Sequence, residues 1–386
     1  MSVPHWLRND ARVIEDRGWV VIGAGITGLS AALALQDAGE DVLVLERDVV
    51  GRRASTRNAG FLMRGAAENY FLASERYGRE LTNKLWRRTE KNLEGLRELG
   101  VETLPSFRAC PSCLLAFEDG ELEEIQRSYE MMRADGFETE WINTGTDAVW
   151  THASPLGGLV NPNDAVCNPA ELIGLLRERF EGMIREQTPV GEVRHANDVI
   201  ELCVPGGIIR AGCVIVCTNA YSRGLGEAMP DVRPNRGQMI ALRVDEHELD
   251  LAYYSDRGSE YFRQADERTV VVGGRRKYRE EEEKTTSEAP TAALQRELEE
   301  FAESILGHRY PVVARWAGTM GFTGDGLPIV RAVDEGERVW FVGGMNGHGM
   351  SMAYRTARLA VDHMMGRGEN PFPDREAAPR EDAAKG

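Results

Sequence analysis

The feature that most constrains the fold is the stretch from Trp19 to Asp48, which reads as strand, glycine-rich turn, helix and strand. A short apolar run precedes the pattern GxGxxG at residues 23–28, and apolar residues then recur at helical spacing until Gly39. A second apolar run, residues 42–45, ends at Glu46, where a Rossmann unit places the acid that binds ribose. This order predicts a dinucleotide-binding βαβ unit.

The glycines of the turn have separate expected roles. Gly23 allows the tight turn, Gly25 lets the backbone approach a pyrophosphate, and Gly28 lets the helix pack close to the strand. Free N–H groups and the positive end of the helix dipole favour binding of a phosphate at the helix N-terminus. The carboxylate of Glu46 can accept hydrogen bonds from both ribose hydroxyls. The turn alone does not distinguish NAD from FAD. The cofactor-binding residues predicted in this unit are Gly23, Gly25, Ile26, Thr27, Gly28, Glu46 and Arg47.

The composition limits the partners of such a chain. Its 386 residues and 42% hydrophobic content allow two compact units with a real core. The formal charge of −16 argues against nucleic acid and anionic membranes, because phosphates would be repelled. No run of about eighteen apolar residues and no signal-peptide pattern occurs, so we expect no membrane span and a cytoplasmic location.

A small, basic segment from Gly51 to Phe61 follows the βαβ unit directly. It is too polar for a core strand, and its backbone amides, serine and arginine side chains could clamp a pyrophosphate. The alternative is a flexible loop with scattered arginines. The contacts predicted here come from Ala54, Ser55, Arg57, Asn58, Ala59 and Gly60.

The sequences GAGITGLSAALAL…LER and ASTRNAGF together resemble the FAD-dependent amine and amino-acid oxidase family of D-amino-acid oxidase, glycine oxidase and sarcosine oxidase. The second sequence is most similar to the gamma-glutamylputrescine oxidase-like branch. The resemblance covers about residues 19–366 and implies FAD rather than NAD. It also implies an α/β fold, in which a Rossmann-type FAD-binding domain carries an inserted α+β domain of antiparallel sheet and helices. The expected limits are 19–67, 163–225 and 312–369 for the FAD-binding domain, 68–162 and 226–311 for the substrate domain, and 1–18 and 370–386 for flexible termini.

Later segments continue the resemblance. A Pro-Val step before two strand-like runs and a Thr-Asn-Ala sequence implies adenine contact by Val190, although these residues alone predict only a β-hairpin. A glycine-rich turn opening the last helix is implied to face the flavin N1–C2=O edge, where helix N-terminal charge would raise the flavin potential. The side chain of His348 could instead be structural. The predicted contacts are Val190, Thr218, Asn219, Gly318, Gly344, Gly347, His348, Gly349 and Met350.

The implied reaction is oxidation of a C–N bond in a small amine or amino acid. A hydride would pass from the α-carbon of the neutral amine to flavin N5, and water would hydrolyse the imine, so positioning matters more than a protein acid or base. We expect O₂ to accept the electrons, forming H₂O₂. The alternatives are a dehydrogenase that uses a quinone or carrier protein, and a flavin-bound protein without turnover.

Three departures from the family pattern bear on the substrate and the cofactor. In amino-acid oxidases of the family an arginine binds the substrate carboxylate, and the matching position here is Met320. This favours a substrate amine without an α-carboxylate, unless Arg275 or Arg276 binds the carboxylate instead. The cysteine that attaches flavin in some relatives corresponds to about Gly318, so we expect non-covalent FAD. Lysines that activate oxygen have no clear counterpart. The residues predicted to act at the substrate are Tyr254, Tyr261, Arg275, Met320, Met345 and His348.

Several other segments have structural expectations only. Residues 68–104 and 121–135 predict helices, 107–117 predicts a strand, and 236–272 predicts strands of an antiparallel sheet. The run Glu280–Glu283 predicts a solvated loop tip. We predict no metal site, since Cys110 and Cys113 form a lone CxxC without a second pair or histidine partner. Tyrosines on a strand pair more often serve only in packing, and this is the alternative for Tyr254 and Tyr261.

Overall fold

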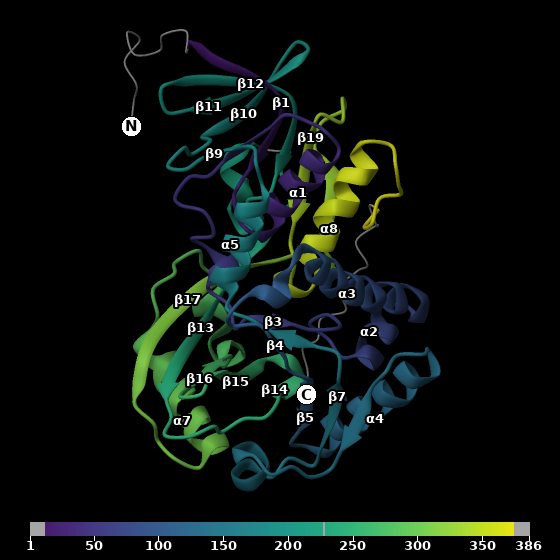
Figure 1. Ribbon diagram of the computed structural model, residues 1–386, viewed down its shortest axis with the longest axis vertical. Helices are drawn as coiled ribbons and strands as arrows, with labels where there is room; N and C mark the ends of the chain where they lie inside the picture. The colour runs from purple at the N-terminus through teal and green to yellow at the C-terminus, as the bar shows by residue number, and fades with distance from the viewer. Residues whose placement is uncertain (1–11, 227, 374–386) are drawn as a thin grey trace.

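An eight-stranded sheet carries the glycine-rich turn of residues 23–28 and is drawn in the upper half of Figure 1. The computed structural model describes residues 12–226 and 228–373. The strands of this first sheet are β1 (Val13–Ile22), β2 (Val42–Leu45), β9 (Met183–Arg185), β10 (Glu192–Ala196), β11 (Val199–Val204), β12 (Gly207–Val216), β18 (Ile329–Ala332) and β19 (Val339–Gly343). Their order is β10–β11–β12–β1–β2–β9, with β19 also paired to β12 and to β18.

The centre of the first sheet is parallel, as a Rossmann-type unit requires. Val21 of β1 pairs with Val44 of β2 on one side and with Ile215 of β12 on the other. The helices α1 (Ile26–Asp37) and α8 (Gly349–Met364) pack against each other over the sheet (Figure 1). Nine of the twelve residues of α1 are buried, so the helix is enclosed on nearly all sides. The predicted Rossmann-type arrangement of this domain is confirmed.

The first strand begins earlier than expected. Residues 13–18, assigned to a flexible terminus, extend β1 and pair in parallel with residues 208–211 of β12. This extension is half-exposed and held by charges, since Arg17 and Arg185 both pair with Glu15. Glu15, Asp16 and Arg17 interrupt this segment, so it lacks the apolar run that predicts a buried strand. Residues 1–11, also assigned to that terminus, lie outside the described residues.

A second eight-stranded sheet forms the lower half of the molecule in Figure 1. Its strands are β5 (Ser112–Ala116), β6 (Glu140–Ile142), β7 (Gly157–Asn161), β13 (Arg233–Arg243), β14 (Ala252–Ser255), β15 (Glu260–Asp266), β16 (Thr269–Gly273) and β17 (Val312–Phe322). The order is β17–β13–β16–β15–β14–β5–β7–β6, and all neighbours are antiparallel except β14 and β5. The structure thus places β17 in the second sheet, although residues 312–322 were expected in the FAD-binding domain.

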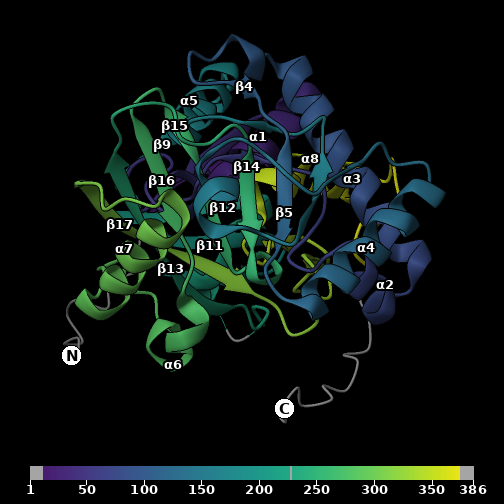
Figure 2. The same cartoon turned by 90° about the horizontal axis from the view of Figure 1, so that it is seen from below.

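Helices flank this second sheet at both ends, as Figure 2 shows from below. Short α6 (Glu280–Glu283) and α7 (Ala292–Leu306) lie near β13 and β17, and α7 buries Leu294 and Leu298 against the sheet. The opposite end carries α2 (Tyr70–Tyr77), α3 (Arg79–Leu99) and α4 (Asp119–Ala134). Among the described residues no helix is both long and apolar enough to span a membrane.

Two elements are more broken than their sequence patterns predict. The expected helix 68–104 is interrupted at Gly78, whose φ of +82° ends α2 and begins α3. The expected strand 107–117 divides into β4 (Arg108–Ala109) and β5, on either side of a turn at Cys110 and Pro111. In the small third sheet, β3 (Phe61–Leu62) and β4 both pair with β8 (Ala165–Val166). α5 (Pro169–Arg179) begins as predicted, with Asn168 accepting a hydrogen bond from Ala170 N.

The expectation of a solvated loop tip at Glu280–Glu283 holds for the exposure of residues 280–282 but is wrong for the loop and for Glu283. These residues form α6, and the side chain of Glu283 is completely buried. It accepts hydrogen bonds from Arg236 Nε at 2.7 Å and from Gln238 Nε2 at 2.8 Å. Both partners belong to β13, more than forty residues earlier in the chain, so nothing in the local acidic run reveals the pairing.

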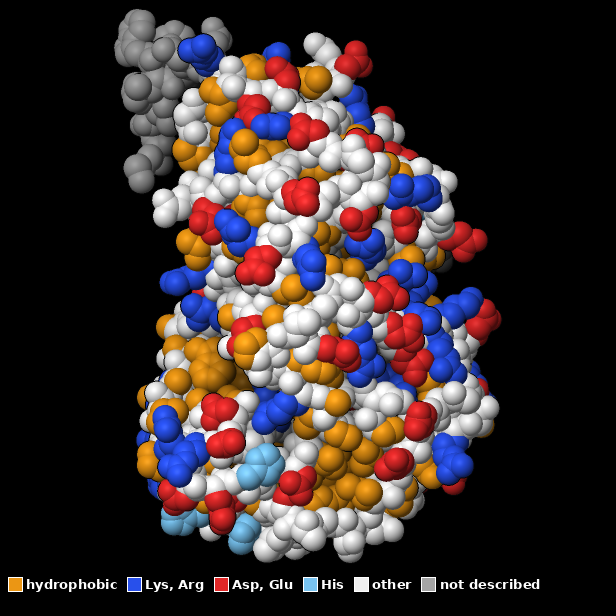
Figure 3. Space-filling view, in the orientation of Figure 1, with side chains coloured by type: hydrophobic (Ala, Val, Ile, Leu, Met, Phe, Trp, Pro, Cys, Tyr) orange, Lys and Arg blue, Asp and Glu red, His pale blue; other side chains and the backbone are white. Residues whose placement is uncertain are grey.

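The end of the chain is partly packed rather than wholly flexible. Asn370 Nδ2 donates to the carbonyl oxygen of Val330, and the ring of Phe372 is 3% exposed. The expected flexible terminus is therefore wrong for residues 370–373, and residues 374–386 lie outside the described part. On the face shown in Figure 3, basic and acidic side chains are interspersed without a large basic patch.

Candidate active site

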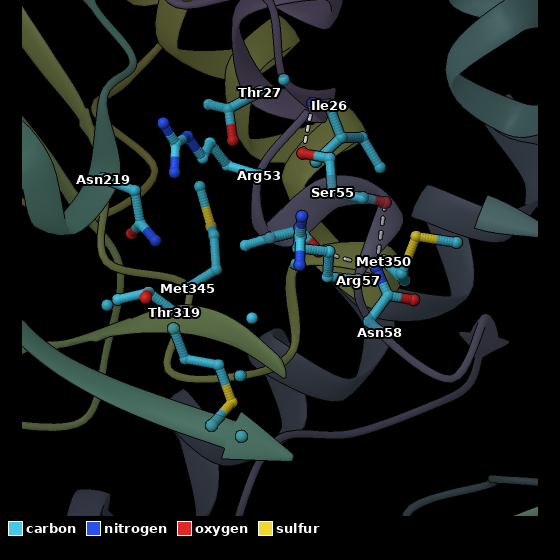
Figure 4. Close-up of a pocket in the computed structure, with 18 of the residues that line it drawn as sticks. Ile26, Thr27, Arg53, Ser55, Arg57, Asn58, Asn219, Thr319, Met345 and Met350 are labelled. Carbon is cyan, nitrogen blue, oxygen red and sulfur yellow. Dashed lines mark hydrogen bonds between the residues drawn. The ribbon is translucent and has the colours of Figure 1, made fainter. Parts of the chain in front are cut away.

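One long cavity lies where the carboxyl ends of β1, β2 and β12 meet the second sheet. It begins at the glycine turn and ends at the N-terminus of α8, and Figure 4 shows part of its lining. The predicted cofactor-binding residues that line it are Gly23, Gly25, Ile26, Thr27, Glu46, Arg47, Ala54, Ser55, Arg57, Asn58, Ala59, Gly60, Val190, Thr218, Asn219, Gly318, Gly347, His348, Gly349 and Met350. Gly28 and Gly344 are not among the lining residues.

The glycine-rich turn requires glycine at two positions, one for its backbone conformation and one for close packing. Gly23 has φ +103°, a conformation that side chains disfavour. A Cβ on Gly28 would lie 1.8 Å from the carbonyl oxygen of Gly23, so the helix can approach the strand only with glycine there. Gly25 opens onto the cavity beside the first amides of α1. The turn therefore places the N-terminus of α1 at the cavity, where the helix dipole favours a phosphate.

Two side chains fix the entry to α1. Ser55 Oγ accepts a hydrogen bond from Ile26 N at 2.9 Å, drawn as a dashed line in Figure 4. Glu46, which is 8% exposed, accepts from Ala24 N at 2.8 Å and from Asp48 N at 2.9 Å. Each carboxylate oxygen has a second lone pair, so Glu46 can still accept from a ribose hydroxyl.

Arginine side chains surround the nucleotide end of the cavity. The guanidinium of Arg47 lies 4.1 Å from the ring centre of Tyr221, and Arg53 donates to Glu288 at 2.9 Å. Figure 4 shows Arg53 beside Thr27, with Asn219 and Met345 nearby. Arg53 and Tyr221 were missed in the sequence because no spacing pattern marks them. Arg57 instead donates to the carbonyl oxygen of Ala317 at 2.9 Å and ties the loop to β17.

Three buried hydroxyl oxygens that belong to cavity-lining residues lack a hydrogen-bond partner within the described chain. They are Thr218 Oγ1, Tyr221 Oη and Thr319 Oγ1. Buried polar groups are rarely left without a partner, because each costs about 1–3 kcal/mol. Phosphates, ribose hydroxyls and a flavin ring supply the acceptors and donors that such groups need. Together with the glycine turn and Glu46, these residues fit FAD.

The far end of the cavity is formed by a turn that leads into α8. Gly344 and Gly347 have φ +70° and +87°, and Asn346 braces the turn by donating to Gly344 O and accepting from Thr323 N. The first amides of α8, from Gly349, face the same space. This second helix N-terminus stabilises negative charge at that end.

His348 lies in this turn and is uncharged near neutral pH. Burial lowers the pKa of its imidazole to about 4, and the nearby positive charge of Arg276 acts in the same direction. Its Nδ1 lies 3.4 Å from the carbonyl oxygen of Asn346, too long and too weak to keep the ring protonated. His348 therefore meets the cavity as a neutral ring.

This lowered pKa predicts a pH-dependent stability. The unfolded chain takes up a proton at His348 near pH 6.5 and the folded chain only near about pH 4, so folding loses stability as pH falls between these values. We expect the stability advantage of the wild type over His348→Gln to shrink across this window, measured by urea unfolding of both proteins. A difference independent of pH would contradict this assignment.

The predicted substrate residues are placed unequally. Tyr254 and Tyr261 pair across β14 and β15 with ring centres 6.1 Å apart, and burial raises the pKa of both hydroxyls. Both line the cavity with Met320, Met345 and His348. Arg275 does not: its Nη1 lies 3.2 Å from Glu260 Oε1, away from the lining. Its neighbour Arg276 lines the cavity instead.

The cysteine pair shows no sign of a metal or redox role. Cys113 is buried and Cys110 half-buried, and both are free thiols whose pKa is raised by burial. A thiol with a raised pKa is a poor nucleophile. Across residues 12–226 and 228–373, no group of three or more His, Cys, Asp or Glu could hold a metal ion.

The chain is similar in sequence to several proteins that are named as oxidases or oxidoreductases. Gamma-glutamylputrescine oxidoreductase of Escherichia coli is 24% identical over 90% of this chain and 84% of its own length. Glycine oxidase of Bacillus licheniformis is 24% identical over 90% of this chain and 92% of its length. The 4-methylaminobutanoate oxidase (formaldehyde-forming) of Paenarthrobacter nicotinovorans is 26% identical over 63% of this chain, but the match spans only 30% of that longer protein.

Solved structures share the fold of this chain, and a family match identifies its family. The crystal structure of glycine oxidase from Geobacillus kaustophilus superposes with a TM-score of 0.78 at 19% identity, covering 92% of this chain and 96% of that one. L-proline dehydrogenase from P. horikoshii gives a TM-score of 0.76 at 20% identity, covering 92% and 95%. The FAD dependent oxidoreductase family, DAO, matches residues 19–363. The chain therefore belongs to the DAO family and is an FAD-dependent oxidoreductase.

Proposed function

We propose that this protein oxidises the C–N bond of a small amine or amino acid and passes the electrons to O₂, forming H₂O₂. The observation that carries the proposal is the continuity of one cavity from the nucleotide turn to a chamber walled by Tyr254, Tyr261, Met320 and Met345. The names of the relatives support it, since they include a glycine oxidase, a gamma-glutamylputrescine oxidoreductase and a 4-methylaminobutanoate oxidase.

The chain's own residues bind, orient and exclude water. Bound FAD supplies the hydride acceptor. The glycine turn, Glu46 and the segment 53–60 hold the nucleotide end, and the α8 N-terminus stabilises negative charge at the other end. Tyrosine and methionine side chains form a mostly apolar wall, which holds a neutral amine close to the reacting position.

The acceptor has a second candidate, a quinone or a carrier protein. No lysine lines the described part of the cavity, and Lys277 forms an ion pair with Asp256 instead. A lysine near the flavin is one way to promote reaction with oxygen, so the lack of a lysine in the described lining favours this dehydrogenase alternative.

The test is a visible absorption spectrum of the purified protein under anaerobic conditions. Glycine, sarcosine, D-amino acids, putrescine and N-methylated amines, including 4-methylaminobutanoate, are added one at a time, and at least one is expected to bleach the flavin. Admission of air then separates the acceptors: rapid reoxidation with H₂O₂ supports an oxidase, and slow reoxidation accelerated by a quinone supports a dehydrogenase. A spectrum that no amine changes would contradict the proposed reaction.

We predict that FAD is held without a covalent bond. Gly318 lies in β17 and cannot form a thioether, and the cavity-lining Cys217 is buried beside Gly23 at the nucleotide end. Acid precipitation should therefore leave the flavin in the supernatant, where its absorption can be measured. Flavin that remains with the washed pellet would show a covalent link.

A further inference from the structure

Five arginines line the described cavity, and four of them already have a carboxylate partner. Arg47 lies 3.7 Å from Asp48, Arg53 lies 2.9 Å from Glu288, Arg57 lies 3.6 Å from the same glutamate, and Arg257 lies 2.9 Å from Glu124. Arg276 differs: no described carboxylate lies within 4.0 Å of its guanidinium, and no described group accepts a hydrogen bond from it.

Arg276 lies at the substrate end of the cavity. Its guanidinium carbon is 5.3 Å from the ring centre of Phe322 in β17. Its positive charge helps to lower the pKa of His348 and opposes the rise in the pKa of Tyr261, so the guanidinium is close to both. Met320 lies in the same wall, near Tyr261 and Gly347. The unneutralised cation thus faces the chamber proposed for the amine.

The residues on either side of Arg276 are anchored outside the cavity. Arg275, with φ +61°, turns its guanidinium to Glu260 and stacks over Tyr278 with 4.3 Å to the ring centre. Lys277 pairs with Asp256. These contacts fix the turn and direct the neighbouring cations away, so Arg276 alone of the three presents its charge to the cavity.

A fixed guanidinium in a largely apolar chamber favours an anion. A half-buried charge without a partner is costly, and a carboxylate that accepts two N–H bonds from arginine offsets that cost. The protein as a whole carries a formal charge of −16, so an unpaired cation facing inward is unusual against this background. The apolar side chains of Met320 and Met345 leave the remainder of the chamber suited to a neutral carbon chain.

We propose that Arg276 binds a carboxylate group of the substrate, so that the substrate is an amine that also carries a carboxylate rather than a simple alkylamine. This inference rests on the proposed function, whose chamber it uses. It names the arginine of the turn between β16 and α6 as the carboxylate-binding residue in place of Met320.

The experiment titrates the holoenzyme with benzoate and, separately, with uncharged benzamide, following the visible spectrum of the flavin. Arg276→Gln removes the positive charge. Arg276→Lys keeps the charge but cannot donate two parallel hydrogen bonds to a carboxylate. Arg279→Gln is the matched control. Arg279 belongs to the same short helix (Arg276–Arg279) but pairs with Glu297 and does not line the cavity.

We expect benzoate to perturb the wild-type spectrum, and Arg276→Gln to weaken its binding roughly 10- to 100-fold. Benzamide binding should change little, Arg276→Lys should be intermediate, and Arg279→Gln should resemble the wild type. Equal benzoate affinity in wild type and Arg276→Gln would overturn the inference. So would an equal loss of benzoate and benzamide, or a changed flavin spectrum with unchanged benzoate affinity, which would place Arg276 at the cofactor instead.

The outcomes also separate this inference from the proposed reaction. If benzoate binds through Arg276 but no amine bleaches the flavin, the carboxylate-binding site is supported and the proposed amine oxidation is contradicted. If amines without a carboxylate reduce the flavin equally fast in wild type and Arg276→Gln, and benzoate affinity is unaffected, the reaction stands and the carboxylate site fails.

Discussion

Gly28→Ala should yield a protein that folds poorly and retains little FAD. The added Cβ would lie 1.8 Å from the carbonyl oxygen of Gly23 and 3.0 Å from its carbonyl carbon, both backbone atoms of the glycine-rich turn. Relief of this overlap must move either the turn or α1. We expect overpacking to cost about 1–3 kcal/mol of unfolding free energy, and the displaced amides to weaken FAD binding by roughly 100-fold.

The measurements are the ratio of flavin to protein absorption after purification and the thermal unfolding midpoint with and without added FAD. Gly174→Ala in α5 is the matched control, because no atom lies within 4 Å of its added Cβ. That helical substitution should leave FAD content unchanged and add up to about 1 kcal/mol of stability. Wild-type FAD content in Gly28→Ala would show that this turn does not hold the cofactor.

The parts of the fold that could be predicted depend on signals within one short stretch. The order of strand, glycine turn, helix and acid in residues 19–48 is local, and so is the capping of α5 by Asn168 and Pro169. The strand-like runs within residues 252–273 likewise predicted the antiparallel strands β14, β15 and β16. Such patterns follow directly from helical and strand periodicity.

What the sequence concealed depends on contacts between distant segments. β17 belongs to the second sheet because it pairs with β13 along most of its length. The residues of β17 alone do not indicate which of the two sheets the strand joins. Gly78 interrupts the helix between residues 70 and 99 through a positive φ that glycine permits but does not require. Burial of Glu283 depends on Arg236 and Gln238 of another strand.

The candidate site shows the same division. Most of the predicted cofactor contacts line the cavity because their motifs fix backbone positions. The sequence could not show which of Arg275 and Arg276 faces the cavity. The direction of each side chain depends on the left-handed backbone of Arg275 and on its ion pair with Glu260. Arg53 and Tyr221 also line the cavity, but nothing in the sequence distinguishes them from their neighbours in the two predicted segments.

Glu283→Ala should destabilise the protein by about 3–5 kcal/mol, because it leaves the guanidinium of Arg236 buried and without its charged partner. The side chains are 6% and 0% exposed, so water cannot replace the lost carboxylate without a rearrangement. Gln238 also loses an acceptor at 2.8 Å. Urea unfolding measures the change, and Glu282→Ala is the control, since the neighbouring carboxylate is 54% exposed and should contribute little.

A double variant separates the buried charge from simple packing. Replacing Arg236 with Met and Glu283 with Leu removes both charges and keeps apolar volume, so it should recover much of the stability lost in Glu283→Ala. A double variant as unstable as the single one would mean that shape, rather than an unpaired charge, causes the loss. Because α6 directly follows the turn that carries Arg276, Glu283→Ala should also weaken benzoate binding, whereas Glu282→Ala should not. Loss of stability with unchanged benzoate affinity would show that the turn is positioned independently of the buried pair.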